Sequence, residues 1–210
     1  MVLDDSKLAQ LARSRVLVVG DSMLDRYWMG EVNRISPEAP VPVISVTHEE
    51  QRMGGAANVA KNIASAGGHP QLLSIVGNDE AGHQLEYMLG ESGIQSRLQF
   101  DADMKTTVKL RMVSRNQQLL RADFESTPGD EALQAGLQSY SDNLLQTGVV
   151  LVSDYGKGGT RNIAQMIEAA TAQNIAVYID PKGQDYSAYR GATLITPNLH
   201  EFQMVAGDVH

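Results

Sequence analysis

The chain has 210 residues, a formal net charge of −8 and a pI near 5.0. This acidic balance argues against binding to nucleic acid or to an anionic membrane, because both require a basic surface. The absence of cysteine excludes disulfides and thiolate chemistry and is natural in a reducing compartment. No apolar run approaches the roughly 20 residues of a membrane span, and the first 15 residues lack a signal-peptide core. We therefore expect a cytoplasmic enzyme domain.

Short apolar runs alternate with helical patterns along most of the chain. A helix is expected directly after Gly54-Gly55, and a second begins near Glu80 with Asp79 as its N-cap. Further helices are expected at 131–145 and 161–173. The apolar runs that predict strands are 16–19, 72–76, 149–152, 176–179 and 193–195. This order predicts an α/β fold in which a mainly parallel sheet is covered by helices on both faces.

Two segments break this alternation. Residues 39–47 are extended and interrupted by prolines, which favours an edge strand. Residues 106–124 predict a hairpin in which apolar and polar side chains alternate on both strands. The polar face carries three cations, Lys109, Arg111 and Arg121. These cations either form a solvated surface or face an anionic ligand. Because neither segment has a helical partner, we expect a separate small sheet, which we call the β lid.

The paired glycines Gly54 and Gly55 stand at the entry to the first expected helix. Glycine lets the backbone approach a ligand closely and adopt a positive φ without steric cost. A helix N-terminus also presents free N–H groups, and Asn58 in its first turn can hydrogen-bond a hydroxyl-rich ligand. The same residues equally suit a plain strand-to-helix turn, so the motif alone leaves both interpretations open.

Polar residues follow the first expected strand, at the carboxyl end of the sheet, where open α/β folds bind ligands. Asp21 is the first of them. Its carboxylate can accept two hydrogen bonds from a ligand, or it can cap the next turn. Asp25 can share the binding role or form a salt bridge with Arg26 or Arg34.

The later strands end in further polar motifs. After the third strand come Asp154 and Lys157, which suit either a phosphate-binding loop or an exposed turn. Lys182 follows the fourth strand. After the fifth, Asn198 and Glu201 lie one turn apart at the start of a helix, so they form either a site motif or a capping box.

Several of these motifs together resemble a known family. Gly54-Gly55-Ala56-Ala57-Asn58, the β lid and the later Asn-x-x-Glu resemble the ribokinase (PfkB) family of sugar kinases. Longer segments at 20–28, 34–43 and 114–119 resemble the heptose 7-phosphate kinases within it. The resemblance runs from about Val16 to the last residues. Such kinases are often the N-terminal half of a bifunctional kinase and adenylyltransferase that serves lipopolysaccharide core synthesis.

The resemblance implies ATP-dependent phosphorylation of the anomeric hydroxyl of a heptose 7-phosphate, with Mg²⁺. It implies a ribokinase-like kinase domain over residues 1–210 that is incomplete at its C-terminus. The substrate-binding residues would be Asp21, Asp25, Arg34, Gly54, Gly55, Asn58, Lys109, Arg111, Asp154 and Lys157. The nucleotide-binding residues would be Lys182, Asn198, Leu199, His200 and Glu201, with Glu201 holding Mg²⁺ through water.

The family's catalytic base belongs to a Gly-Ala-Gly-Asp segment at a late helix N-terminus. Val205-Ala206-Gly207-Asp208 resembles it, but this segment comes soon after Asn198 and its glycine suits the end of a helix. We therefore expect the base beyond residue 210, and we expect the chain as given to lack turnover.

Other functions remain open at this point. The chain could be a sugar-phosphate-binding module without catalysis, or a kinase for another phosphorylated sugar such as fructose 6-phosphate. A dinucleotide-binding oxidoreductase requires G-x-G-x-x-G after the first strand, and residues 20–25 do not contain it. Apolar residues on the lid predict a homodimer joined through its strands.

Overall fold

The body of the molecule is built on one six-stranded sheet. The computed structural model describes residues 14–207. The strand order is β10-β9-β8-β1-β4-β5, and every pair is parallel. The strands are β1 (Arg15–Gly20), β4 (His69–Gly77), β5 (Gln95–Asp101), β8 (Val149–Ser153), β9 (Ala176–Asp180) and β10 (Leu194–Ile195). The predicted parallel sheet is therefore confirmed.

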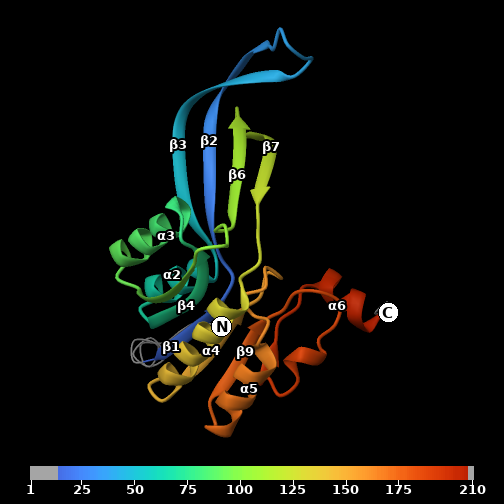
Figure 1. Cartoon of the computed structure of the whole chain (residues 1–210). Helices are drawn as coiled ribbons and strands as arrows, with labels where there is room; N and C mark the ends of the chain where they lie inside the picture. Colours follow the sequence, from blue (N-terminus) through green and yellow to red (C-terminus); the bar gives the residue numbers. More distant parts are fainter. Residues whose placement is uncertain (1–13, 208–210) are drawn as a thin grey trace.

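Helices cover both faces of this sheet (Figure 1). Along β1, Leu17 and Val19 point into one apolar cluster and Val18 points into the other. The Leu17 cluster includes side chains of α4 (Asp130–Leu144) and α5 (Ile163–Ala172), and the Val18 cluster includes those of α2 (Ala56–Ser65) and α3 (Glu80–Glu91). A 3₁₀ helix, η1 (Ser187–Tyr189), and α6 (Leu199–Ala206) complete the chain order. No helix in the described part is long and apolar enough to cross a bilayer.

A second sheet projects from the body as the β lid (Figure 1). Its strand order is β3-β2-β6-β7. The strands are β2 (Ser22–Ile35), β3 (Pro42–Gly55), β6 (Val108–Ser114) and β7 (Gln117–Phe124). β2 pairs antiparallel with β3 and parallel with β6. As predicted, β3 is an edge strand, and β6 and β7 form a hairpin.

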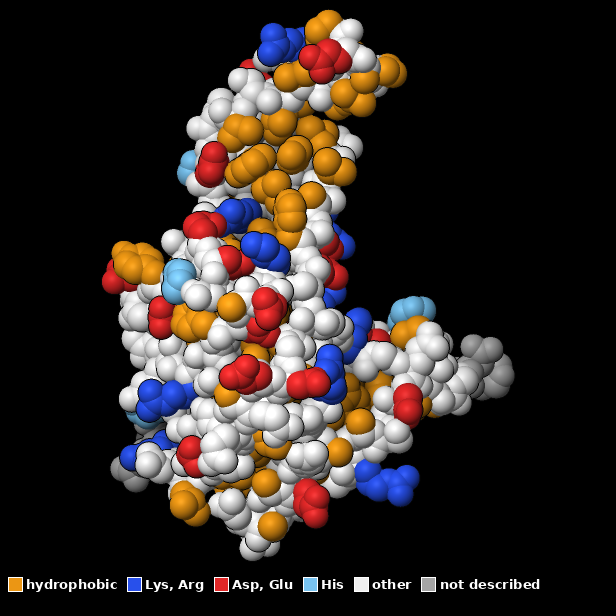
Figure 2. All heavy atoms as spheres, in the orientation of Figure 1, with side chains coloured by type: hydrophobic (Ala, Val, Ile, Leu, Met, Phe, Trp, Pro, Cys, Tyr) orange, Lys and Arg blue, Asp and Glu red, His pale blue; other side chains and the backbone are white. Residues whose placement is uncertain are grey.

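The two faces of the hairpin differ in character, as the alternation predicted. Leu110 pairs with Ala122 and Met112 with Leu120 on one face, whereas Lys109 pairs with Asp123 on the other. Apolar side chains gather on the upper part of the lid in Figure 2. Leu120 is 55% exposed there, although Val108 at the foot of the lid joins the core of the body.

Two strands were absent from the sequence prediction, and one was longer than expected. No element was predicted for β2, whose polar residues were considered only as candidate site residues. β5 has few apolar residues, and it lies at the edge of the body sheet. β3 extends beyond the predicted 39–47 to Gly55. The predicted N-cap of α3 is confirmed, because Asp79 Oδ1 accepts the Gly82 N–H at 2.9 Å.

Candidate functional site

A cavity of about 460 Å³ lies at the foot of the lid, where the two sheets meet. We call it the lid cavity. Its volume is within the roughly 300–1,000 Å³ typical of small-molecule sites. The structure brings six of the predicted substrate residues together in its lining: Asp25, Gly54, Gly55, Asn58, Lys109 and Arg111. Further lining residues are Met23, Tyr27, Arg52, Met53, Lys61, Arg121 and Tyr155.

Cations dominate the lining of the lid cavity. Arg52, Lys61, Lys109, Arg111 and Arg121 stand against a single carboxylate, Asp25. In a chain with a net charge of −8, such a concentration of positive charge favours an anionic ligand.

Carboxylates pair with four of these cations: Glu50 with Arg52, Asp123 with Arg121, and further carboxylates with Arg111 and Lys109. Arg111 Nη1 donates to Asp25 Oδ1 at 2.5 Å. Lys109 Nζ donates to Asp123 at 2.9 Å and to Glu125 at 3.2 Å. These charge-assisted bonds fix both cationic groups before a ligand arrives, which lowers the entropy cost of binding.

Tyr27 lies between two of the arginines. The guanidinium carbons of Arg52 and Arg111 are 4.6 Å and 5.2 Å from the centre of its ring. Both distances are within the range of a cation–π contact. Tyr27 therefore packs beneath the cations and positions them.

The paired glycines are required by close packing rather than by flexibility. A Cβ at Gly54 would lie 2.6 Å from Asp25 Oδ2. Gly55 has a φ of 57°, and a Cβ there would lie 2.1 Å from the Asp21 carbonyl oxygen. No larger residue fits at either position without displacing its neighbours. The glycines thus allow the end of β3 to pack against the start of β2.

A second cavity, of about 320 Å³, lies at the carboxyl ends of β8, β9 and β10. We call it the strand-end cavity. Its lining contains Asp154, Tyr155, Asp180, Pro181, Lys182, Thr196, Pro197, Asn198 and Glu201. Tyr155 belongs to the lining of both cavities, so the two adjoin.

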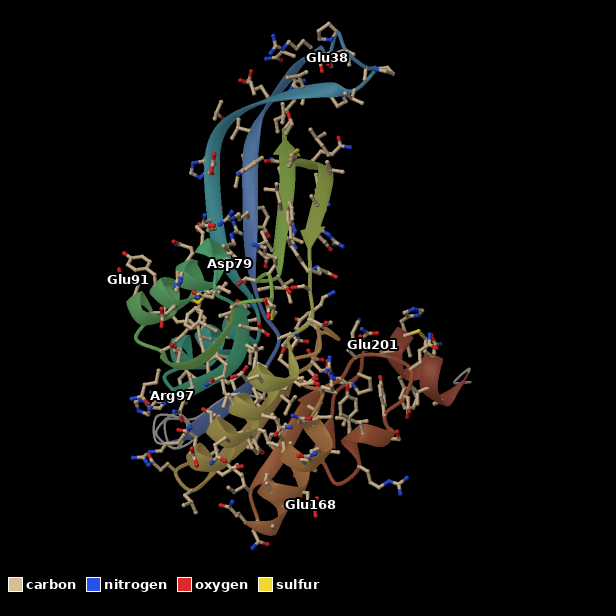
Figure 3. The ribbon with its side chains drawn as sticks, in the orientation of Figure 1. Glu38, Asp79, Glu91, Arg97, Glu168 and Glu201 are labelled. Carbon is tan, nitrogen blue, oxygen red and sulfur yellow. The ribbon has the colours of Figure 1, made fainter. Side chains whose placement is uncertain are left out.

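The predicted Asn-x-x-Glu motif forms a capping box at the start of α6. Asn198 Oδ1 accepts the Glu201 N–H at 2.9 Å, and Glu201 Oε2 accepts the Asn198 N–H at 3.1 Å. Lys182 Nζ donates to Glu201 Oε1 at 2.8 Å. The Lys182 hydrogen bond, together with the Asn198 N–H, lowers the pKa of Glu201. Glu201 is labelled in Figure 3 at the beginning of this helix.

Asp180 is the carboxylate of the strand-end cavity that stands without a partner. Within residues 14–207, its side-chain oxygens accept no hydrogen bond and form no ion pair, although its backbone carbonyl accepts the Asp154 N–H. Burial raises its pKa, and the negative charge of nearby Glu201 raises it further. A cation entering this cavity would therefore find a carboxylate free to pair with it.

The residues of the strand-end cavity suit Mg²⁺ that is bound through water molecules rather than directly. Residues 14–207 contain no cluster of three or more metal-ligating side chains. Both Glu201 oxygens already accept hydrogen bonds. Direct ligation by Glu201 would have to compete with these bonds, whereas contact through a metal-bound water would not. Mg²⁺ characteristically keeps several of its waters in proteins.

The structure corrects the predicted role of Asp21. Its side chain is 4% exposed and points away from the lid cavity. Oδ2 accepts the N–H groups of Tyr155 and Lys157, both at 2.9 Å, and Oδ1 accepts that of Gly159 at 3.0 Å. Its carboxylate is thus occupied by backbone N–H groups of the loop after β8.

Two further substrate assignments are not supported by the geometry. Arg34 pairs with Val43 near the far end of β2, distant from both cavities; Glu38, labelled in Figure 3, marks that tip. Lys157 Nζ lies 2.7 Å from Glu125 and is outside both linings. A side chain's direction cannot be inferred from its place in a motif.

The remaining corrections concern the strand-end cavity. Asp154, expected to bind sugar, lines this cavity instead, where Tyr189 donates its hydroxyl to Asp154 Oδ2 at 2.7 Å. Leu199 and His200 face away from it on the first turn of α6, and both are exposed. Gly207 is the C-cap of α6, as predicted, whereas Asp208 lies outside the described residues.

Tyr155 is the main site residue that the sequence prediction missed. Its place at the end of β8, next to Asp154, was the available signal. Arg52 and Lys61 were also missed. Arg52 lies on a part of β3 beyond the predicted strand, and Lys61 lies in α2 outside any motif that was singled out.

The chain thus combines a parallel sheet that is covered by helices on both faces with a projecting β lid and a cationic cavity at the foot of that lid. Residues 13–209 match the model of the pfkB family of carbohydrate kinases, and the chain belongs to that family. It is 50% identical over 198 residues to a D-beta-D-heptose 7-phosphate kinase of Bordetella bronchiseptica, covering 94% of this chain and 63% of the relative.

A second relative is the bifunctional protein HldE of Pseudomonas fluorescens. The identity is 54% over 193 residues, which cover 91% of this chain and 40% of HldE. The chain thus spans less than two thirds of either relative. Its fold is similar to that of a carbohydrate kinase from Agrobacterium tumefaciens, with a TM-score of 0.74 at 14% identity, covering 92% of this chain and 64% of that structure.

Proposed function

We propose that this chain provides the sugar site of an ATP-dependent kinase that phosphorylates the anomeric hydroxyl of a heptose 7-phosphate. The observation that carries the proposal is the lid cavity, in which five cations adjoin Asp25 and Asn58. The Bordetella relative is named for this substrate. The product would enter ADP-heptose and lipopolysaccharide core synthesis in the cytoplasm.

The two ends of such a substrate need different chemistry. Asp25 can accept hydrogen bonds from sugar hydroxyls, and Asn58 can both donate and accept them. Lys109 and Arg111 suit the phosphate, because arginine binds phosphate through two parallel bonds and lysine adds a point charge. Gly54 and Gly55 contribute backbone atoms to the lining of the lid cavity.

The strand-end cavity would receive the phosphates of ATP. Lys182 would contact them, and Asn198 and Glu201 would order water around Mg²⁺. Bound Mg²⁺–ATP would supply the transferred phosphoryl group. The chain's own contribution is to position the sugar, neutralise its phosphate and cover the site with the lid, and positioning and charge neutralisation account for most of phosphoryl-transfer catalysis.

We propose that no described residue acts as the general base. Within the described part, Asp25 is the sole carboxylate of the lid cavity, and it is already bonded to Arg111. The chain alone should therefore bind ligand without turnover. Release of ADP by purified 1–210 protein that depends on heptose 7-phosphate would contradict this.

Titration calorimetry with heptose 7-phosphate and with unphosphorylated heptose tests the sugar assignment. Lys109→Ala should weaken the phosphorylated sugar by about 10- to 100-fold, as expected for a lost hydrogen bond to a charged group. Unphosphorylated heptose should bind unchanged. Lys157→Ala is the matched control, because it removes a nearby lysine outside the cavity. Equal losses for both sugars would refute a phosphate role for Lys109.

The same titration separates the alternatives. Tighter binding of fructose 6-phosphate than of heptose 7-phosphate would identify a different sugar kinase. Binding without turnover in the native gene product would identify a module that binds sugar phosphate only. The HldE relative is named as bifunctional, and we propose that an adenylyltransferase domain accompanies this one in its parent; the mass of the native gene product tests that.

The lid would also join two copies of the chain. Its exposed apolar side chains include Ile35, Val41, Leu119, Leu120 and Phe124. Packing these faces against each other would remove them from water, and apolar patches of this kind commonly mark interfaces. A monomer by light scattering at micromolar concentration would refute the homodimer.

A further inference from the structure

We propose that Asp21 is a positioning residue that holds Tyr155 at the boundary between the two cavities, where Tyr155 contacts both the sugar and the nucleotide. The identity of these ligands rests on the proposed function, whereas the positioning itself does not. Asp21 is the single residue between β1 and β2, so it is anchored in the body directly beneath the lid.

The first step concerns the contacts of the carboxylate. Three N–H groups at alternate positions of one loop, those of Tyr155, Lys157 and Gly159, donate to it at 2.9, 2.9 and 3.0 Å. Every partner is a donor, so the ionised carboxylate, which only accepts, matches the loop better than any neutral side chain of the same shape. A buried group with this many bonds orders the backbone that supplies them.

The second step is the close approach of the loop. A Cβ at Gly159 would lie 2.7 Å from Asp21 Oδ1. Gly156 and Gly158 have φ values of 68° and 94°, a region that favours glycine. The loop is therefore wrapped around the carboxylate, and its conformation depends on Asp21.

The third step is the opposite side of the loop. The Asp154 N–H donates to the Asp180 carbonyl at 3.0 Å, and Tyr189 donates its hydroxyl to Asp154. The backbone on either side of Tyr155 is thus held by Asp21, which lies between β1 and β2, and by Asp180 of β9. Precise placement of a site residue requires this kind of support.

The fourth step is the chemistry of Tyr155. Its side chain lines the lid cavity beside Asp25 and the strand-end cavity beside Lys182. Burial raises the pKa of Tyr155, and the negative charges of Asp180 and Asp25 raise it further. The phenol consequently keeps its proton at neutral pH and can donate a hydrogen bond to an oxygen of either ligand.

Amide hydrogen exchange tests, without any ligand, whether Asp21 holds the loop through these three N–H groups. In the wild-type chain the amides of Tyr155, Lys157 and Gly159 should be protected. Asp21→Asn replaces an acceptor oxygen with an amide donor that faces these N–H groups, so their exchange should accelerate at least tenfold while the β8 amides of Val150 and Val152 stay protected. Unchanged protection at all three positions would overturn the role of Asp21.

Calorimetry then tests whether Asp21 supports the binding of both ligands. Heptose 7-phosphate and a non-hydrolysable ATP analogue are titrated separately. Asp21→Asn should weaken both by about tenfold per folded molecule. Asp25→Asn should weaken only the sugar, and Lys182→Ala only the nucleotide. A purely structural Asp21 would lower thermal stability and leave both affinities unchanged, and that result would overturn the proposal.

Tyr155→Leu guards against misfolding of the Asp21 variant. Tyr155 is partly exposed, and this substitution leaves the loop N–H groups in place. It should lower the affinity for both ligands while the three amides remain protected. A lower affinity for only one ligand would contradict the proposed contact of Tyr155 with both. If the wild type binds neither ligand, the proposed function fails. The exchange result still shows whether Asp21 holds the loop.

Discussion

The body and the lid are both β-sheets, yet they are stabilised in opposite ways. The body sheet is packed on both faces by helices, and its central strands are nearly continuous apolar runs. No described helix lies over the upper part of the lid sheet, and the β6–β7 hairpin of this sheet alternates apolar and polar residues. A sheet buried on two faces supplies stability, whereas a sheet exposed on both can present side chains to ligands and to a second subunit.

The site lies where these two regions join. One residue separates β1 from β2, and none separates β3 from α2. The body therefore fixes the foot of the lid, and the cations of β6 reach the cavity from a strand paired with β2.

The largest effect is expected in the body. Leu85→Ala removes a side chain of α3 that is 0% exposed. The free energy of unfolding should fall by about 2–5 kcal/mol, as is usual for leucine truncation in a core. Urea denaturation measures it. A loss below about 1 kcal/mol would mean that the body does not dominate stability.

The next largest loss of stability is expected where the lid joins the body. Gly55→Ala places a Cβ 2.1 Å from a backbone oxygen at a φ of 57°, and the free energy of unfolding should fall by about 2–4 kcal/mol from strain and displacement. Gly67→Ala is the matched control: its φ is 88° but no atom lies within 4 Å. It should cost about 1 kcal/mol. Similar costs for both variants would show that the joint tolerates movement.

A smaller, pH-dependent effect is expected at the edge of the body. The pKa of Glu201 is lowered below its ordinary value of 4.5, so the folded state binds its proton more weakly than the unfolded state does. This contribution to stability is fully present above pH 4.5 and is lost as the pH falls through the lowered pKa. Because Lys182 is half exposed, Glu201→Gln should cost at most about 1 kcal/mol at neutral pH. Urea denaturation at neutral and acidic pH should show the difference between the two proteins vanishing in acid.

The smallest effect is expected in the lid. Leu120→Ala truncates a side chain that is 55% exposed, so the unfolding free energy of the monomer should change by less than about 0.5 kcal/mol. In a lid-joined dimer the same substitution should also lower the melting temperature at high protein concentration more than at low. A loss of monomer unfolding free energy as large as that of Leu85→Ala would contradict the view that the body sheet supplies most of the stability.

The fold was largely predictable where a local pattern coincides with burial. The body strands β1, β4 and β8 are apolar runs, and the hairpin of β6 and β7 alternates regularly, so both were predicted. β2 was missed because its buried and half-buried residues, such as Asp25 and Arg26, do not form a regular apolar pattern. Their partners are on β3 and β6, distant in the chain, and no local pattern encodes those contacts.

The site was predictable in its composition but only partly in its geometry. The predicted cations Lys109 and Arg111 do meet Asp25 and Asn58 in one cavity. Asp21 and Asp25 stand four positions apart in one motif, yet one carboxylate is occupied by backbone N–H groups and the other faces the cavity. Which of them is free depends on where the loop after β8 returns, and that depends on tertiary structure.

The parallel pairing of β2 with β6 has a consequence for biosynthesis. β2 ends at Ile35 and β6 begins at Val108, which is 108 − 35 = 73 positions later. At about 5–20 residues per second, a ribosome needs roughly 4–15 s to cover that distance. During this time the first lid hairpin can emerge with one side of β2 unpaired, and an unpaired strand edge readily accepts a strand from another chain. Newly made copies on one messenger RNA are therefore most exposed to mispairing at β2, before β6 has been synthesised.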